Sequence, residues 1–306
     1  MRRSRRVVFG APLLALLLVA AACGTGGDDD ETAGNGEERP QITVGDDSFA
    51  ESQIVAEMFT IVLEEAGFEV DRTSVDSREI RIPAMESGEI DLAPEYLATL
   101  LLFLNPDADP PSDPADAADQ LEPLVEERGL ALLEFSEAVD TNAFVVTQET
   151  ADEFDLEAVS DLQGVAGDMT LGGPPECPQR PFCIPGLKRV YDVEFGRFRQ
   201  LDVGGPITVQ ALAGGEIDVG LLFSTSGAIA RQGFVLLEDD RNLQAADNIV
   251  PLIRSDVLDQ EITDLLNQIT AALTTENITE LNARVEVDQE DPDAVARSFL
   301  EEEGLL

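Results

Sequence analysis

Apolar and polar residues follow the same order in two stretches of the chain, residues 82–96 and 209–223. Each stretch has apolar residues at helical spacing, then Gly-Glu-Ile-Asp, then a short apolar run that ends in an aromatic residue. A glycine can end a helix in the left-handed conformation without steric cost, and a short apolar run is typical of a buried strand. The pattern therefore predicts two equivalent units, each a helix followed by a strand.

The two units also align their aromatic residues, since Tyr96 and Phe223 stand at the same distance from the shared Gly-Glu-Ile-Asp. In open α/β sheets, ligands bind in the crevice outside the carboxyl ends of the strands. We therefore expect two lobes, with Tyr96 and Phe223 facing each other across one cleft. Taken singly, each Gly-Glu-Ile-Asp could be no more than a good connection between a helix and a strand.

The rest of the chain alternates between strand patterns and helix patterns. We predict strands at 41–45, 69–75, 130–135, 141–147, 164–167, 195–201 and 248–254, helices at 48–66, 78–87, 115–128 and 188–192, a loop at 172–175, and helices over the last fifty residues. The chain leaves the first block of elements and later returns to it. This order predicts an α/β fold with two lobes, 41–141 plus 248–306 and 142–247, joined by two hinge crossings.

The N-terminus has the pattern of an export signal. Residues 1–22 begin with an arginine-rich head, continue with an apolar run too short to span a bilayer, and end in three alanines. Cys23 follows directly, and this segment resembles the lipobox of bacterial lipoproteins, whose cysteine is lipidated. Ordinary secretory cleavage is the alternative. Residues 23–40 are too polar to fold and predict a disordered tether.

The formal net charge of −43 excludes partners that are themselves strongly anionic, such as nucleic acid. An acidic surface either reflects a salty or acidic habitat or raises the local concentration of cationic solutes. The chain has no histidine, and Lys188 is its only lysine. No motif for an activated serine or a phosphate-binding loop is present, so an enzyme is disfavoured and no cofactor is expected.

Two cysteines, Cys177 and Cys183, lie in a proline-rich loop. Because the export signal directs the chain to an oxidising compartment, we predict a disulfide between them. A metal site is the competing interpretation, and it lacks other ligands in a chain without histidine.

Several motifs follow one another in a characteristic order: S-F-A-E-S-Q at 48–53, S-R-E-I at 77–80, E-S-G-E-I-D-L-A-P-E-Y ending at Tyr96, N-A-F-V-V-T at 142–147, G-G-P-P at 172–175, L-K-R-V-Y at 187–191, Q-A-L-A-G-G-E-I-D-V at 210–219, L-L-E-D-D at 236–240 and A-L-T-T-E at 272–276. This order resembles the glycine betaine, choline, carnitine and osmoprotectant-binding lipoproteins of ABC importers. The resemblance covers residues 41–306.

The resemblance implies a type II periplasmic-binding-protein fold that holds a quaternary ammonium solute between its lobes. It also implies an ABC permease as partner and a monomer attached outside the cell membrane through Cys23. A sensor or adhesion lipoprotein built on the same two lobes is the alternative, as is the same fold with a different small polar solute.

The resemblance also implies individual site residues. Tyr96 corresponds to the family's cage tyrosine and Thr99 to a threonine three residues on, while Phe223 stands where another cage tyrosine is frequent. Val209 stands where a further tyrosine is usual, which leaves the identity of the ligand open. The expected substrate-binding residues are Ser48, Phe49, Asp76, Tyr96, Thr99, Asn142, Phe144, Gln210, Phe223 and Ser224.

Two of these residues have a further expected role. Ser48 is a candidate N-cap, and the free N–H groups after it could bind an anion. Asp76 would favour a bare cation such as choline over a zwitterion, whose carboxylate it would repel. For Asp76, Thr99 and Asn142 a helix cap or a loop hydrogen bond is the alternative.

Overall fold

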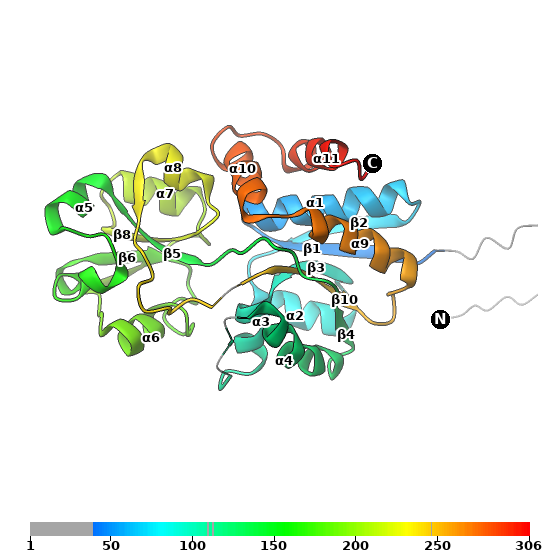
Figure 1. The fold of residues 1–306 in the computed structure, drawn as a ribbon, viewed down its shortest axis with the longest axis horizontal. Helices are drawn as coiled ribbons and strands as arrows, with labels where there is room; N and C mark the ends of the chain where they lie inside the picture. Colours follow the sequence, from blue (N-terminus) through cyan, green and yellow to red (C-terminus); the bar gives the residue numbers. More distant parts are fainter. Residues whose placement is uncertain (1–38, 109, 112, 246) are drawn as a thin grey trace, which may run out of the picture. The chain divides into compact units, whose positions relative to one another are not determined.

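The computed structural model describes residues 39–306 except 109, 112 and 246 (Figure 1). The described residues belong to one compact unit. The predicted export signal, Cys23 and all but the last two residues of the tether lie outside them.

The strands form two five-stranded mixed sheets. The first has the order β2-β1-β3-β10-β4 and the second β7-β6-β8-β5-β9. The first sheet is built from β1 (Gln41–Asp47), β2 (Glu69–Val75), β3 (Leu92–Tyr96), β4 (Leu130–Leu132) and β10 (Ile249–Arg254). The second is built from β5 (Asn142–Thr147), β6 (Thr170–Gly173), β7 (Arg197–Gln200), β8 (Val219–Phe223) and β9 (Phe234–Leu236).

Each sheet has its own helices, as Figure 1 shows. The first is surrounded by α1 (Ala50–Glu65), α2 (Arg78–Ser87), α3 (Leu97–Leu104), α4 (Pro114–Glu126), α9 (Gln260–Ala272), α10 (Thr275–Glu286) and α11 (Pro292–Glu302). The second is surrounded by α5 (Gln148–Phe154), α6 (Ile184–Gly186), α7 (Pro206–Ala213) and α8 (Gly227–Gln232). The same part of the chain also contains the short helices η1 (Val159–Leu162), η2 (Ala166–Asp168) and η3 (Leu187–Tyr191).

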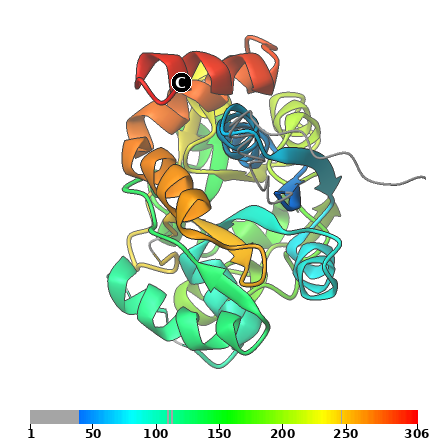
Figure 2. The ribbon, with the colours of Figure 1, turned by 90° about the vertical axis from the view of Figure 1, so that its right-hand side faces the viewer.

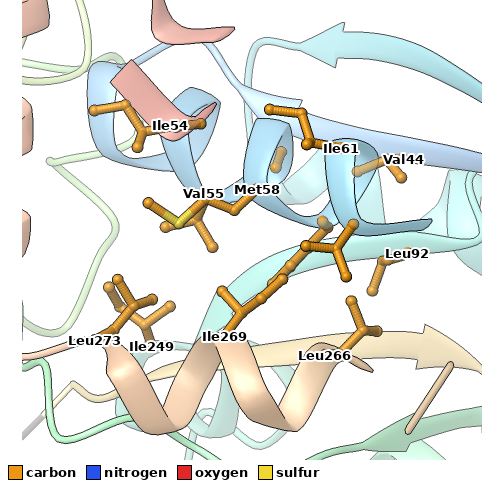
Figure 3. Packing of buried hydrophobic residues seen from close by; sticks show 14 of the residues in the cluster. Val44, Ile54, Val55, Met58, Ile61, Leu92, Ile249, Leu266, Ile269 and Leu273 are labelled. Carbon is orange, nitrogen blue, oxygen red and sulfur yellow. The ribbon is translucent and has the colours of Figure 1, made fainter. Parts of the chain in front are cut away.

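The largest apolar cluster lies between α1, the first sheet and the C-terminal helices. Figure 3 shows Met58 and Ile61 of α1 opposite Leu266 and Ile269 of α9, and all four side chains are almost wholly buried. Figure 2 shows the C-terminal helices, in orange and red, following one another along this part of the molecule. Removal of this much apolar surface from water makes the first lobe a stable base for the site.

The internal repeat is confirmed in hydrogen-bond detail. Gly88 and Gly215 both adopt left-handed backbone conformations, with φ of 82° and 67°. The Asp91 carboxylate accepts a hydrogen bond from the backbone N–H of Thr43 at 2.8 Å, and the Asp218 carboxylate accepts one from Thr170 at 2.7 Å. Each aspartate thus joins its strand to the parallel neighbour, and β3 and β8 have the same setting in their sheets.

The chain crosses between the sheets at two places that lie side by side. Val139 and Asn248 form an antiparallel bridge, and the backbone N–H of Asp140 donates to the carbonyl of Asp247 at 3.0 Å. A third contact joins α8 to α10, where Ser226 donates to Glu286 at 2.7 Å. The C-terminal helices therefore support both sheets close to the crossings.

Some predicted bounds were wrong. Gly172 and Gly173 belong to β6 rather than to a loop, because they pair in parallel with β7, and Gly172 also pairs with β8. Position 172 requires glycine because a side chain there would collide with Ile217. The strand predicted at 164–167 accordingly begins only at Thr170. The strand at 130–135 ends at Leu132, where its pairing with β10 ends.

Candidate functional site

A cavity of about 660 Å³ lies between the two sheets. Its walls come from the residues that follow β1 and β2, the start of α3, the two crossings, the disulfide loop and the end of β8. The volume is in the range of small-molecule sites, and its place beyond the ends of strands is the usual one for α/β folds.

Three aromatic side chains pack together at the cavity wall. The ring centroid of Phe49 lies 4.8 Å from that of Phe223 and 6.3 Å from that of Tyr96. The sequence predicted that Tyr96 and Phe223 face each other across one cleft, and the structure adds Phe49 in contact with both. The reason is local, because the chain turns from β1 into α1 at Phe49. Grouped aromatic faces attract cations.

Tyr96 is oriented by a buried glutamate that the sequence analysis missed. Its hydroxyl donates to Glu51 Oε1 at 2.8 Å, while Thr225 and Asn282 donate to Glu51 Oε2 at 2.6 and 2.9 Å. Burial raises the pKa of Glu51, and the three hydrogen bonds partly offset this. Burial, together with the charge of Glu51, raises the pKa of Tyr96. Glu51 thus ties α1 to α10 and to the segment after β8.

Two aspartates lie at the crossings and line the cavity. Asp247 accepts hydrogen bonds from the backbone N–H groups of Ala98 at 2.7 Å and Thr99 at 3.1 Å. Burial nevertheless raises the pKa of Asp247 to about 6. Burial also raises the pKa of Asp140, helped by the nearby charge of Glu51. A cation in the cavity would stabilise the charged form of both groups.

A buried ion network lies beneath the wall that α2 and β3 form. The Glu95 carboxylate accepts hydrogen bonds from Arg78 at 2.7 Å and from Arg81 at 2.5 Å, and Arg81 also pairs with Asp47. Burial would raise the pKa of Glu95, but the two guanidinium groups outweigh it and lower the pKa to about 2. Arg78 also donates to the hydroxyl of Thr99 at 2.8 Å. This network fixes Thr99 and neutralises Arg78.

The disulfide loop forms the wall opposite α2. The Sγ atoms of Cys177 and Cys183 are bonded, with their Cα atoms 5.3 Å apart. Arg180, within the loop, donates to both carboxylate oxygens of Glu79 at 3.0 and 3.1 Å. Both side chains are partly exposed, so this ion pair joins the loop to α2 at the solvent edge of the cavity.

The structure brings six of the ten predicted residues to this cavity: Phe49, Asp76, Tyr96, Thr99, Asn142 and Phe223. Asp76 is exposed at the rim, whereas Asn142 is half-buried and donates weakly to the Phe182 carbonyl at 3.4 Å. The lining residues also include Phe103 and Phe182, which the sequence analysis missed. Phe182 directly precedes Cys183 of the predicted disulfide, and this neighbour could have indicated that the position of Phe182 is fixed.

Four predicted residues are not part of the cavity wall: Ser48, Phe144, Gln210 and Ser224. Ser48 is not the N-cap, which is Phe49, and its hydroxyl instead donates to the carbonyl of Val75. Phe144 is buried in the core of the second sheet, and Gln210 is exposed on α7. Ser224 donates to Asp140 at 3.1 Å, so it supports the crossing.

Val209, where the expected tyrosine is missing, also lies outside the cavity wall. It is half-buried on α7 and packs against the second sheet's apolar cluster. A larger side chain at this position would therefore first meet the neighbours of α7.

Carboxylates outnumber cationic groups around the cavity. The acidic lining residues are Asp47, Asp76, Glu79, Asp140, Glu176 and Asp247, and the basic ones are Arg78 and Arg180. Because Arg78 pairs with Glu95 and Arg180 with Glu79, neither carries an uncompensated charge. A cationic group is therefore favoured here over an anionic one. Within the described part of the chain, no cluster of three or more potential metal-binding side chains occurs.

Two sheets of equivalent build, two adjacent crossings and a cavity between the sheets define a two-lobed substrate-binding protein of the type II periplasmic kind. Over residues 40–302 the chain matches the family described as the substrate binding domain of ABC-type glycine betaine transport system. The chain belongs to this family. None of the helices in residues 39–306, as far as the structure describes them, is long and apolar enough to cross a bilayer.

Relatives of known function agree with this assignment. The chain is 28% identical to a glycine-betaine-binding protein of Pseudomonas aeruginosa, with 87% of this chain and 88% of that protein covered. It is 26% identical to the carnitine transport binding protein OpuCC of Listeria monocytogenes, with 89% of each covered. A crystal structure of a glycine betaine/carnitine/choline ABC transporter protein matches with a TM-score of 0.68 and 26% identity, over 86% of this chain and 99% of that one.

Proposed function

We propose that this protein captures a quaternary-ammonium osmolyte of the glycine betaine, choline or carnitine type in the cavity between its lobes and delivers it to an ABC permease. The observation that carries the proposal is the contact of Phe49 with both Tyr96 and Phe223 at the wall of a cavity rich in carboxylates. Aromatic faces and negative charge are the two features that bind a desolvated cation.

The magnitudes require both features. One cation–π contact contributes about 0.5 to 2 kcal/mol, whereas micromolar affinity corresponds to about 8 kcal/mol. Three aromatic rings alone fall short of this, so the carboxylates at the crossings and the apolar wall supply the rest. Among these carboxylates, Asp140 and Asp247 are the most deeply buried.

Further parts of the proposal follow from the sequence. The protein binds its solute reversibly without chemical turnover, acts as a monomer and is held outside the cell membrane by a lipidated Cys23. If Cys23→Ser is processed and retained in the membrane fraction like the wild type, the lipid anchor is refuted. A permease and an ATPase encoded by neighbouring genes would support import over a purely sensing role.

Titration calorimetry with choline, carnitine, glycine betaine and proline betaine tests the ligand. Tyr96→Ala and Phe223→Ala should each weaken binding by about 1 to 2 kcal/mol, or roughly five- to thirtyfold. Phe154→Ala is the matched control, because Phe154 is 41% exposed on α5 and is not part of the cavity wall. The proposal fails if none of these solutes binds at millimolar concentration while a neutral or anionic solute does.

A further inference from the structure

The loop between β6 and α6 is braced within itself. The disulfide joins Cys177 to Cys183, and the backbone N–H of Arg180, within this ring, donates to the carbonyl of Glu176, directly before the ring, at 3.1 Å. The N–H of Cys183 in turn donates to the carbonyl of Arg180 at 3.0 Å. A short covalent ring with internal hydrogen bonds has few alternative conformations, so the side chains it carries have a defined direction.

The same loop is also anchored to the parts of the chain around it. Gln244, just before the second crossing, donates to the Phe182 carbonyl at 3.0 Å, and Asn142, at the first crossing, lies within 3.4 Å of the same oxygen. On the outer side, Arg180 pairs with Glu79 of α2. The position of Phe182 is therefore set by both crossings and by the opposite lobe.

Phe182 lines the cavity with only 7% of its surface exposed. It belongs to the same apolar cluster as Ala98 and Leu102 of α3, so it lies where the two lobes meet. Phe182 comes from a different part of the chain than Phe49, Tyr96 and Phe223, whose rings pack together at tilted angles. Val209, which stands on α7 where an aromatic residue was expected, is not aromatic and does not line the cavity.

We propose that Phe182 is a specificity-determining residue, which supplies an aromatic face for the ligand's cationic group, and that the disulfide between Cys177 and Cys183 positions it. The proposal rests on the proposed function, since it concerns the same cavity. A phenylalanine that only filled space would be replaceable by another apolar side chain. A phenylalanine that recognises a cation would not be replaceable in this way, because the quadrupole of its ring attracts positive charge in addition to excluding water.

The test compares choline with 3,3-dimethyl-1-butanol, a neutral molecule of the same shape in which carbon replaces the quaternary nitrogen. The purified full-length protein is titrated with both, and the ratio of the two affinities is recorded. In Phe182→Leu and Phe182→Met this ratio should fall about two- to thirtyfold, because both variants keep the apolar contact but lack the ring. Phe182→Tyr should keep the ratio, and Phe154→Leu is the control for an exposed phenylalanine.

The outcomes separate the two proposals. If the wild type binds neither choline nor any other quaternary ammonium solute, the proposed function fails and the role of Phe182 falls with it. If the wild type prefers choline and both Phe182→Leu and Phe182→Met keep the wild-type ratio, only the role of Phe182 is refuted. Far-ultraviolet circular dichroism of each variant checks that the change in ratio occurs in folded protein.

A double-mutant cycle tests the role of the disulfide. Replacement of Cys177 and Cys183 by serine should lower the choline preference in the wild-type background and leave it unchanged in Phe182→Leu, because the ring is then already gone. An equal loss in both backgrounds would mean that the disulfide acts on the cavity without Phe182, which overturns the positioning role.

Discussion

Replacing Asp247 by asparagine should remove a pH-dependent part of the protein's stability. The carboxyl group is only 5% exposed, and burial raises its pKa to about 6 from an ordinary value of 3.8. A difference of this size corresponds to about 3 kcal/mol in the free energy of unfolding. Asparagine keeps an acceptor oxygen for the backbone N–H groups of Ala98 and Thr99, so the hydrogen bonds can remain.

The sign follows from the direction of the pKa shift. Above pH 6 the folded protein holds Asp247 as a buried charge, which lowers its stability. As the pH falls from above 6 to below about 4, the folded chain takes up a proton before the unfolded chain does, so the wild type is stabilised. Asp247→Asn cannot take up this proton. Over this pH range the free energy of unfolding of the wild type should therefore rise by about 3 kcal/mol relative to that of the variant.

Urea unfolding of both proteins at several pH values between 4 and 8 measures this difference. Glu51 and Asp140 titrate in both proteins, so the difference between the two curves isolates Asp247. The exposed Asp155, replaced by asparagine, is the matched control and should give a curve parallel to that of the wild type. Parallel curves for wild type and Asp247→Asn would refute the reasoning.

Three further predictions concern stability. Glu95→Gln removes the anionic partner of the buried Arg78 and one of the two anionic partners of the buried Arg81, which keeps Asp47. This change should cost about 3 to 5 kcal/mol in urea unfolding, and a loss below about 1 kcal/mol would contradict it. Gly227→Ala should cost about 1 to 3 kcal/mol, since its new Cβ would lie 2.3 Å from the Cα of Ala283, whereas Gly167→Ala meets nothing within 4 Å and should leave the melting temperature nearly unchanged. Loss of the disulfide in Cys177→Ser should cost about 2 kcal/mol, and alkylation of the unreduced wild type should label neither cysteine of the pair.

Much of the fold was predictable because it depends on local patterns. The strand predicted at 69–75 and the helix predicted at 78–87 have the predicted bounds. The repeat was visible because a glycine that ends a helix and an apolar strand after it are features of neighbouring residues. The prediction was weakest at Gly172 and Gly173, where glycine is needed because side chains distant in the sequence pack closely against the backbone.

The site divides in the same way. The place of Tyr96 and Phe223 at the cavity could be predicted from the sequence alone, because each ends a strand whose direction the pattern already defines. Only the tertiary structure decided that Phe182 lines the cavity and that Glu51 binds Tyr96, Thr225 and Asn282, since these partners are distant in the chain. Likewise, Gln210 was expected in the site but is exposed on α7. Local sequence determines which elements form, whereas the face that a side chain presents to a cavity depends on how those elements pack against others far along the chain.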